Sequence, residues 1–436
     1  MNEQRLLNKV PHSTEIVSPL IDFPTRTIAL DSEDLEKRRS LAHIVPENSV
    51  PFSKVMEKPL FIRPHLLLTN RCNMTCSYCF ADEGTYGRDI AGMEDILSEQ
   101  IALFAANSLL DDIPVALVHF GGEPLLNLQT MQTIVNETKG LAGKYGSSHF
   151  YNAVITNGTM ITEEVASFLV DNEIKVVLSL DGRKSLHDRV RKLKNDEGSF
   201  ERIIAGLSYF PTGYPLIIRA TISYWTDIPK EIVFFRSLGA SEIEFGYLGE
   251  YPSEVNIIES LKHQLNQLFV HAIKNDDSKS ISKVRPFNDW MKKIHAFTYH
   301  KDECYSSKDC GAGRTRLAIT PDGSILPCIA FYNLDDWKDR IIGHVSHGID
   351  RALQVDFLNK SFTERQQCFS CFHRIVCAGP CLGPPATAHG NFLPDCYSPH
   401  SNEDTVTGMT QSLILYWYCI LREEKPVLLN QILEEI

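Results

Sequence analysis

The sequence lacks an excess of basic residues. Its 436 residues include 43 lysines and arginines against 55 aspartates and glutamates, which gives a formal net charge of −12. A protein whose main partner is nucleic acid needs a basic face for the phosphates. We therefore expect no nucleic-acid partner.

The sequence also lacks a secretory signal and a long apolar run. Its first ten residues, MNEQRLLNKV, contain no apolar core of the kind found in signal peptides. The longest apolar run, 413–421 (LILYWYCIL), is too short to span a bilayer and predicts a buried helix. We expect a cytoplasmic protein without a membrane partner. Since the cytosol keeps thiols reduced, the twelve cysteines predict metal ligation rather than disulfides.

Three of these cysteines stand in one short stretch, Cys72-Asn-Met-Thr-Cys76-Ser-Tyr-Cys79. Their spacing, C-x3-C-x2-C, can supply thiolates to three irons of a [4Fe–4S] cube and leaves the fourth iron without a protein ligand. An open iron after a strand is a place where a small molecule can chelate. Short cysteine spacings also suit zinc, so a zinc site is the alternative at this point.

Residues 61–276 alternate short apolar segments with amphipathic ones, a pattern that predicts βα units and a parallel sheet. In parallel barrels the chemistry lies at the carboxyl ends of the strands, and the three cysteines follow the first expected strand. We expect strands at 62–69, 114–120, 150–156, 174–180, 215–223 and 241–247. We expect helices near 93–109, 127–142, 162–172, 199–209, 229–238 and 255–275.

Polar or glycine-rich residues follow three further strands. The turn Gly121-Gly122-Glu123-Pro124 ends the second strand, and its glycines allow a close approach of the backbone to a ligand. Asn157 and Ser179 close the third and fourth strands with short polar groups suited to ribose or carboxylate. Arg191 could pair with a carboxylate through two hydrogen bonds. Ordinary turn chemistry is the alternative for Asn and Asp before glycine.

The cysteine triad, with the aromatic Tyr78 before its last member, resembles the signature of the radical SAM enzymes. The resemblance implies an open (β/α)6 partial TIM-like barrel. In that family the open iron binds the amino and carboxylate groups of S-adenosylmethionine (SAM), and one electron cleaves it to a 5′-deoxyadenosyl radical. The turn at 121–124 is similar to the family's GGEP, which binds the methionine amino group. The implied cofactor-binding residues are Tyr78, Gly121, Gly122, Glu123, Pro124, Asn157, Ser179 and Arg191.

A denser group of cysteines after residue 300 resembles the SPASM domain, which carries two auxiliary [4Fe–4S] clusters. Eight cysteines are the number that two fully ligated cubes need. The resemblance implies that Cys304, Cys310, Cys328 and Cys381 hold the nearer cluster. It implies that Cys368, Cys371, Cys377 and Cys396 hold the outer one. Paired zinc knuckles, the alternative, do not explain the upstream triad.

The expected organisation has five parts. The first is an N-terminal extension with a short helix at Ser32–Leu41, either a truncated leader-recognition segment or a simple arm. The radical SAM barrel, a connecting helix, the SPASM domain and a C-terminal helical segment follow. Their expected ranges are 1–60, 61–276, 277–303, 304–400 and 401–436.

The resemblance implies a ribosomally made precursor peptide as the substrate and a flavodoxin- or ferredoxin-type electron donor, with a separate leader-recognition protein as a further partner. We favour a carbon–carbon crosslink between side chains, because Cys304 would give the nearer cluster four thiolates. The stretch 78–84 (YCFADEG) resembles thioether-forming maturases instead. Anaerobic sulfatase-maturating enzymes commonly have an Asp where this chain has Ile329. A further alternative is an iron–sulfur electron carrier without enzymatic activity. Such a protein would have no use for an iron that lacks a protein ligand. No catalytic residue is identified from the sequence.

Overall fold

The structure, a computed structural model, describes most of the chain from residue 61 onwards. The described residues are 20–22, 27–29, 59, 61–110, 113–145, 150–247, 257–299, 310–364, 376 and 406–434. The helix predicted at Ser32–Leu41 lies outside these ranges, as do six of the predicted auxiliary-cluster cysteines. These six are Cys304, Cys368, Cys371, Cys377, Cys381 and Cys396.

Six parallel strands form the centre of one sheet, and each begins and ends within one residue of its predicted range. They lie side by side in chain order, so each strand pairs with the one that follows it. Their bounds are β3 Arg63–Thr69, β5 Val115–Gly121, β6 Phe150–Thr156, β7 Lys175–Ser179, β9 Leu216–Ile222 and β10 Ala240–Tyr247.

The six predicted helices also form, one after each strand. Their bounds are α4 Ile96–Leu110, α5 Leu128–Tyr145, α6 Glu163–Asp171, α8 Phe200–Leu207, α9 Ile228–Ser237 and α10 Ile257–Asn275. Parallel strands joined in this way by helices confirm the predicted α/β fold.

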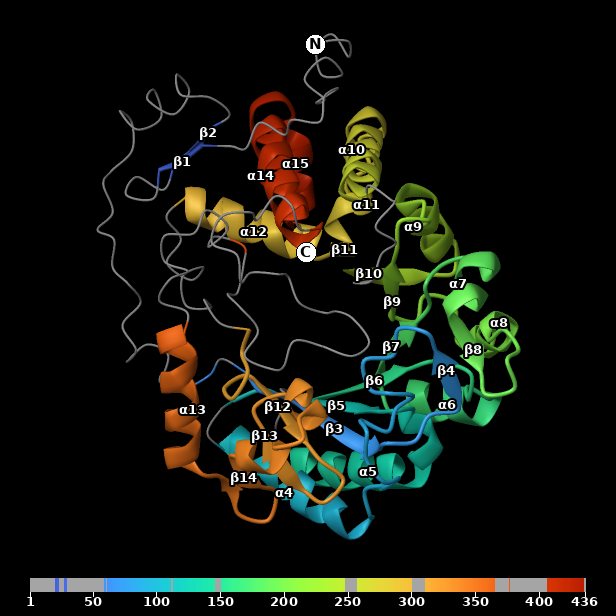
Figure 1. Ribbon diagram of the computed structural model, residues 1–436, viewed down its shortest axis with the longest axis vertical. Coiled ribbons are helices and arrows are strands. Elements are labelled where there is room, and N and C mark those ends of the chain that lie inside the picture. Colours follow the sequence, from blue (N-terminus) through green and yellow to red (C-terminus); the bar gives the residue numbers. More distant parts are fainter. Residues whose placement is uncertain are drawn as a thin grey trace.

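The sheet has two unlike faces, because successive residues of a strand point to opposite sides. Leu66, Leu117 and Ile218 belong to one face and lie in the main buried core. Figure 1 shows the sheet curving from β3 through β7 to β10, with helices on its outer side. The apolar face is therefore convex and covered by helices, and the other face is the concave inside of an open barrel.

The sheet continues beyond the six predicted strands at both edges. At one edge β12 (Arg316–Ile319) pairs parallel with β3, and at the other β11 (Val284–Arg285) pairs parallel with β10. Beyond β12 an antiparallel ribbon follows, made of β13 Ser324–Leu326, β14 Gly343–His344 and β15 Gly348–Ile349. The described segment from residue 310 onwards is thus joined to the barrel sheet, which the sequence analysis did not predict.

The C-terminal apolar run forms the buried helix that the sequence predicts. It lies in α14 (Val406–Glu424), where Trp417 stacks on Phe269 with ring centroids 5.3 Å apart and donates to the side chain of Asn266. In the part of the chain that the structure describes, no helix has both the length and the apolar character to cross a membrane.

The remaining elements are short or lie at the edges. The described part of the predicted connecting segment holds α11 Lys279–Ser282 and α12 Phe287–Thr298. The other elements are β1 Leu20–Asp22, β2 Thr27–Ala29, β4 Met74–Cys76, α7 Lys184–Val190, β8 Arg191–Leu193, α13 Arg351–Glu364, α15 Pro426–Glu434 and three 3-10 turns at Pro124–Asn127, Ile329–Asn333 and Trp337–Arg340.

Candidate functional site

The three cysteines of the triad lie on the loop that leaves the carboxyl end of β3. Cys76 ends β4, which pairs antiparallel with β8 so that Cys76 stands opposite Arg191. The backbone N–H of Cys79 donates to the carbonyl of Cys76 over 3.1 Å, which closes a tight turn between the two. All three are free thiols, neither fully buried nor fully exposed. Ionised Cys76 and Cys79 would each raise the pKa of Cys72, so the loop brings the three thiols close to one another.

Two side chains donate toward the sulfur atoms from outside the loop. Asn157 Nδ2 lies 3.8 Å from Cys72 Sγ, and Arg191 Nη1 lies 4.0 Å from Cys76 Sγ. Burial raises the pKa of Cys72 to about 12 and that of Cys76 to about 11. Thiols with pKa values raised in this way ionise only with strong positive compensation, which metal ions supply when they bind thiolates.

The surroundings of the triad fit a [4Fe–4S] cluster. A cube takes each thiolate on a different iron, and this loop offers three free thiols for three of its four irons. The buried hydroxyl of Tyr86 has no hydrogen-bond partner, and the ring packs in the same apolar cluster as Cys79. Such an orphaned donor beside the thiols suits the sulfur atoms of a cluster.

The Gly121–Pro124 turn packs directly on the cysteine loop. A side chain on Gly121 would place its Cβ 2.4 Å from the carbonyl oxygen of Thr69, and one on Gly122 would place its Cβ 2.3 Å from that of Arg71. Two backbone hydrogen bonds join the turn to the loop, Gly122 to Thr69 over 2.9 Å and Glu123 to Arg71 over 2.8 Å. Both positions therefore require glycine, and the turn and the loop form one unit.

The Glu123 side chain is fully buried and bonded within the chain. Its carboxylate accepts hydrogen bonds from Thr156 Oγ1 (2.7 Å), the Asn157 backbone N–H (2.7 Å) and the Leu125 backbone N–H (3.1 Å). Burial raises its pKa to about 7, and the three donors oppose that rise. The carboxylate thus ties the end of the second barrel strand to the end of the third, beside the thiol of Cys72.

Tyr78 and Arg191 form a partly buried charged cluster with the buried Asp181 on the other side of the loop. Arg191 Nε donates to Asp181 Oδ2 over 2.8 Å, and the Tyr78 hydroxyl donates to the same oxygen. The guanidinium lies 5.2 Å from the centre of the Tyr78 ring. Burial alone would lower the pKa of Arg191, but the charge of Asp181 more than offsets this. Arg191 is therefore a fixed cation next to Cys76.

Asp181 is central to the site, and sequence reasoning did not select it. Its second oxygen accepts the backbone N–H of Thr221 on β9 over 2.8 Å. Its own backbone N–H donates to Nδ1 of the buried His187, whose Nε2 bonds Ser199. Burial lowers the pKa of His187 to about 4, so this imidazole is neutral near pH 7. The sequence signal was the stretch 179–182 (SLDG), which offers short polar groups suited to ribose or carboxylate, but only Ser179 was selected from it.

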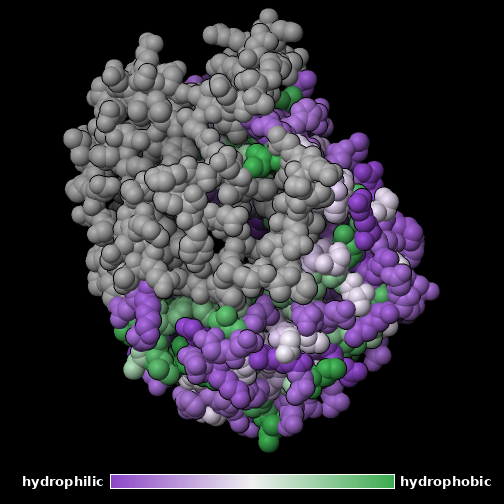
Figure 2. Space-filling model, viewed as in Figure 1, coloured by the Kyte–Doolittle hydropathy of each residue, from purple (hydrophilic) through white to green (hydrophobic). Residues whose placement is uncertain are grey.

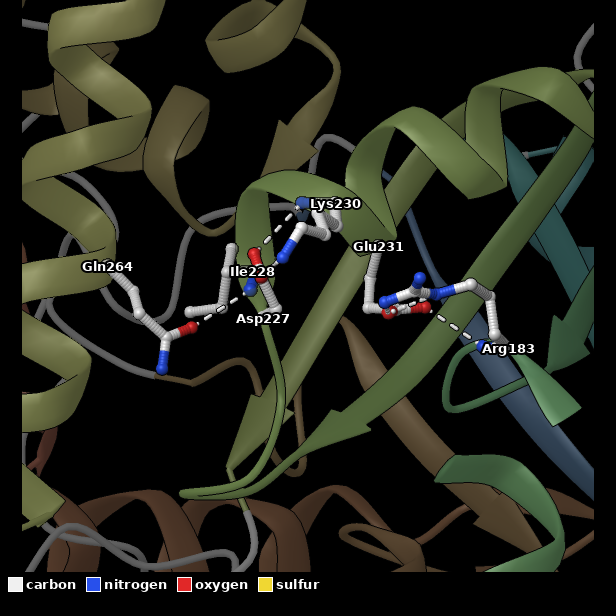
Figure 3. Close-up of polar contacts among 6 residues, drawn as sticks. All are labelled: Arg183, Asp227, Ile228, Lys230, Glu231 and Gln264. Carbon is white, nitrogen blue, oxygen red and sulfur yellow. Dashed lines mark hydrogen bonds and ion pairs between the residues drawn. The ribbon is translucent and has the colours of Figure 1, made fainter. Parts of the chain in front are cut away.

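The loop that carries Asp181 is held by helix α9 (Figure 3). Glu231 on this helix is fully buried and accepts the backbone N–H of Arg183 over 2.9 Å, its Nε over 2.9 Å and its Nη2 over 2.7 Å. Gly182 approaches so closely that a Cβ there would lie 2.8 Å from Glu231 Oε2. The helix begins at the capping residue Asp227, and the adjacent N–H of Ile228 donates to Gln264 on α10.

We expect Glu231→Gln to lower the free energy of unfolding by about 2 kcal/mol, because hydrogen bonds to a charged group contribute about 1.5–3 kcal/mol. The amide keeps one acceptor for three donors. Lys230→Ala is the matched control, since it breaks the exposed Lys230–Asp227 pair on the same helix and should cost at most about 1 kcal/mol. Urea denaturation measures both. An equal loss in the two variants would contradict the anchoring role of Glu231.

Two of the predicted auxiliary-cluster cysteines are described, and they lie at one end of the β12–β13 hairpin. Cys310 precedes this hairpin and Cys328 follows it. The backbone N–H of Gly313 donates to the carbonyl of Pro327 over 2.8 Å, which holds the two flanks together. The Cys328 sulfur accepts the N–H of Ala330 over 3.3 Å.

Hydrogen bonds hold the segment after Cys328 against the triad loop. Arg88 donates to the carbonyls of Tyr332 and Leu334, over 2.7 and 2.5 Å at the shortest, and its guanidinium lies 4.8 Å from the centre of the Tyr332 ring. Asn333 Nδ2 donates to the carbonyl of Phe80, the residue after Cys79, over 3.0 Å. The structure therefore brings Cys328 and the triad onto neighbouring loops.

Three comparisons relate the chain to known proteins. The family model of the Radical SAM superfamily matches residues 66–214. A cysteine-type anaerobic sulfatase-maturating enzyme of Clostridium novyi is 26% identical over 335 residues, which cover 72% of this chain and 85% of that protein. An uncharacterised protein of Methanocaldococcus jannaschii is 30% identical over 217 residues, 47% of this chain and 71% of its own length.

A solved structure shares the fold. It is described as native anSMEcpe with bound AdoMet and Cp18Cys peptide, and it matches with a TM-score of 0.61 and 22% identity. The match covers 85% of this chain and 98% of the other. The two chains therefore share an overall fold over most of their lengths.

Proposed function

Because the chain belongs to the radical SAM superfamily, we propose that it binds SAM at a [4Fe–4S] cluster on Cys72, Cys76 and Cys79 and removes a hydrogen atom from a peptide. The observation that carries this proposal is the close packing of the cysteine loop and the Gly121–Pro124 turn at the carboxyl edge of the sheet. When bound and reduced, the cluster supplies the electron that cleaves SAM and so yields the radical.

The chain's own residues would bind and orient SAM around this loop. We assign the SAM carboxylate to Arg191, because this cation is held beside Cys76 and carries donors beyond its bond to Asp181. We assign the methionine amino group to the turn at 121–124. The turn is held in place because the buried Glu123 side chain accepts a hydrogen bond from the Asn157 N–H. Asn157, Ser179 and Tyr78 line the same edge and complete the proposed set.

We further propose two auxiliary [4Fe–4S] clusters in a SPASM domain at 304–400. Cys310 and Cys328 support the nearer one, since both stand at the end of the β12–β13 hairpin. The remaining ligands are assigned from the sequence resemblance alone. A cluster with four protein thiolates is suited to accept the electron left after a substrate radical closes onto a neighbouring group.

The peptide substrate is inferred from the relatives. The Clostridium enzyme is a sulfatase-maturating enzyme by name, and the matched structure contains a peptide. We propose that this chain modifies a ribosomally made precursor peptide and forms a carbon–carbon link between side chains, with a thioether as the alternative. Sulfatase maturation is a second candidate because of the sequence match, although Ile329 stands where that group commonly has an Asp.

We expect the co-expressed precursor peptide to lose two hydrogens and keep all its cysteine thiols reactive. Tandem mass spectrometry after alkylation measures both properties. A carbon–carbon link leaves each thiol free, whereas a thioether consumes one and protects it from alkylation. A product that reacts with a hydrazide reagent would instead reveal an aldehyde and favour sulfatase maturation. Loss of a thiol would contradict the preferred crosslink and the role given to Cys304.

A further inference from the structure

Four arginines from four strands face one another across the concave inside of the barrel. They are Arg63 on β3, Arg316 on β12, Arg219 on β9 and Arg285 on β11. The charge of Arg63 interacts with those of the other three. Five strands separate β3 from β11 in the sheet, so these side chains meet only because the sheet curls and they point inward.

Only part of this positive charge is balanced. Arg285 pairs with Glu242 over 2.9 Å and with Glu244 over 3.5 Å, both on the neighbouring strand β10. Among the described residues, no ion pair reaches Arg63, Arg219 or Arg316. The described part of the inner face thus carries an excess of positive charge in a chain whose formal net charge is −12.

The excess charge lies in a partly desolvated place. Arg63 is half-buried, and its Nε has no hydrogen-bond partner. Burial lowers the pKa of Arg63 to about 10, helped most by the charge of Arg316, while Glu244 opposes the change. Burial and the same arginines lower the pKa of His65 to about 3, so this imidazole is neutral near pH 7. Crowded like charges in low dielectric favour the binding of an anion.

We propose that Arg63, Arg219 and Arg316 bind side-chain carboxylates of the substrate peptide, which makes acidic peptides the preferred substrates. This inference rests on the proposed function and specifies its substrate. Guanidinium groups bind carboxylates through two parallel hydrogen bonds. Figure 2 shows hydrophilic residues over much of the described surface on this side of the molecule. Arg219 and Arg316 are exposed and free to receive such a ligand.

The position of the cluster predicts where the acidic residue lies in the substrate. Arg63 and Arg316 are the first residues of their strands, whereas the cysteine loop leaves the last residue of β3, Thr69. Arg219 stands further along, opposite Ser179 at the end of β7. At about 3.3 Å per residue, β3 spans about 20 Å from Arg63 to Thr69. An extended peptide bridges that distance with about six residues, so Asp or Glu should lie within that separation of the modified residue.

Fluorescence anisotropy on the full, reconstituted chain tests the site. The probes are fluorescein-labelled, C-terminally amidated decapeptides of alternating serine and glutamate, or of serine and glutamine. We expect the glutamate peptide to bind at least about tenfold more tightly, and Arg219→Gln to remove at least about threefold of that preference. Arg63→Gln and Arg316→Gln should act in the same direction. Arg202→Gln, on the exposed side of α8, removes the same charge elsewhere and should change nothing.

The outcomes separate the site from the proposed function. Equal binding of the two amidated peptides, or an equal effect of Arg202→Gln and Arg219→Gln, would overturn the site. A glutamine peptide with a free C-terminal carboxylate that binds as tightly as the glutamate peptide would show recognition of a chain end and overturn it too. Failure of the wild-type chain to cleave SAM in the same preparation would overturn the proposed function and leave the binding result standing.

Discussion

Replacing Cys76 with alanine should abolish SAM cleavage and remove about four of about twelve irons per chain, on the count of four irons per cube. A cube that keeps only two of its three thiolates on this loop has no other ligand within reach on the strand pair β4–β8, where Cys76 faces Arg191. Iron and sulfide analysis of the anaerobically reconstituted protein measures the cluster, and chromatography of 5′-deoxyadenosine measures cleavage.

The control for this experiment is Cys419→Ala. Cys419 is fully buried in α14, in the C-terminal apolar run and outside every cluster motif. Its loss should lower stability by about 1 kcal/mol, as removal of a small buried group does, and leave the iron content unchanged. Undiminished cleavage by the Cys76 variant, or tightly bound zinc in place of iron in the wild type, would refute the assignment of the triad.

The positions of the barrel strands and of the cysteine triad could be predicted because both are local in the sequence. A buried strand such as β6 is a short apolar run between turns, and the predicted range 150–156 is the observed one. The turn at 121–124 could also be recognised, since Gly121-Gly122-Glu123-Pro124 is one continuous stretch at the end of a predicted strand.

What the sequence did not reveal depends on contacts between distant segments. The short strand β12 forms because it pairs with β3, which lies about 250 residues earlier in the chain. The inward arginines come from strands that meet only when the sheet curls, so no window of sequence contains Arg63 and Arg285 together. Glu231 looks like an ordinary helix residue until the loop at Arg183 packs on it.

Asp181 illustrates the same limit at the site. In sequence it is one more Asp before glycine, which ordinary turn chemistry explains. In the structure one of its oxygens serves both Tyr78 and Arg191, and the other serves Thr221. Sequence reasoning selected Arg191 for SAM binding. In the structure Arg191 is held in position by Asp181, which sequence reasoning did not select.

Asp181→Asn should lower the free energy of unfolding by about 3–5 kcal/mol, because removing one partner of a buried ion pair leaves the other charge uncompensated. The Arg191 side chain is only 12% exposed and that of Asp181 only 3%. An asparagine has a single acceptor oxygen. If it faces Thr221, its amide N–H groups point at the donors of Arg191 and Tyr78. We also expect weaker SAM binding, since Arg191 would lose its fixed position beside Cys76.

The matched control is Asp196→Asn, which removes the same charge from the exposed pair that Asp196 forms with Lys192 on the adjacent strand β8. Exposed pairs of this kind contribute at most about 1 kcal/mol, so stability and SAM affinity should hardly change. Urea denaturation and equilibrium dialysis with labelled SAM measure the two properties. If Asp181→Asn loses stability but binds SAM as the wild type does, Asp181 supports the fold alone and Arg191 does not hold the SAM carboxylate. If both properties fall together and Asp196→Asn spares them, the buried pair positions the cofactor through Arg191.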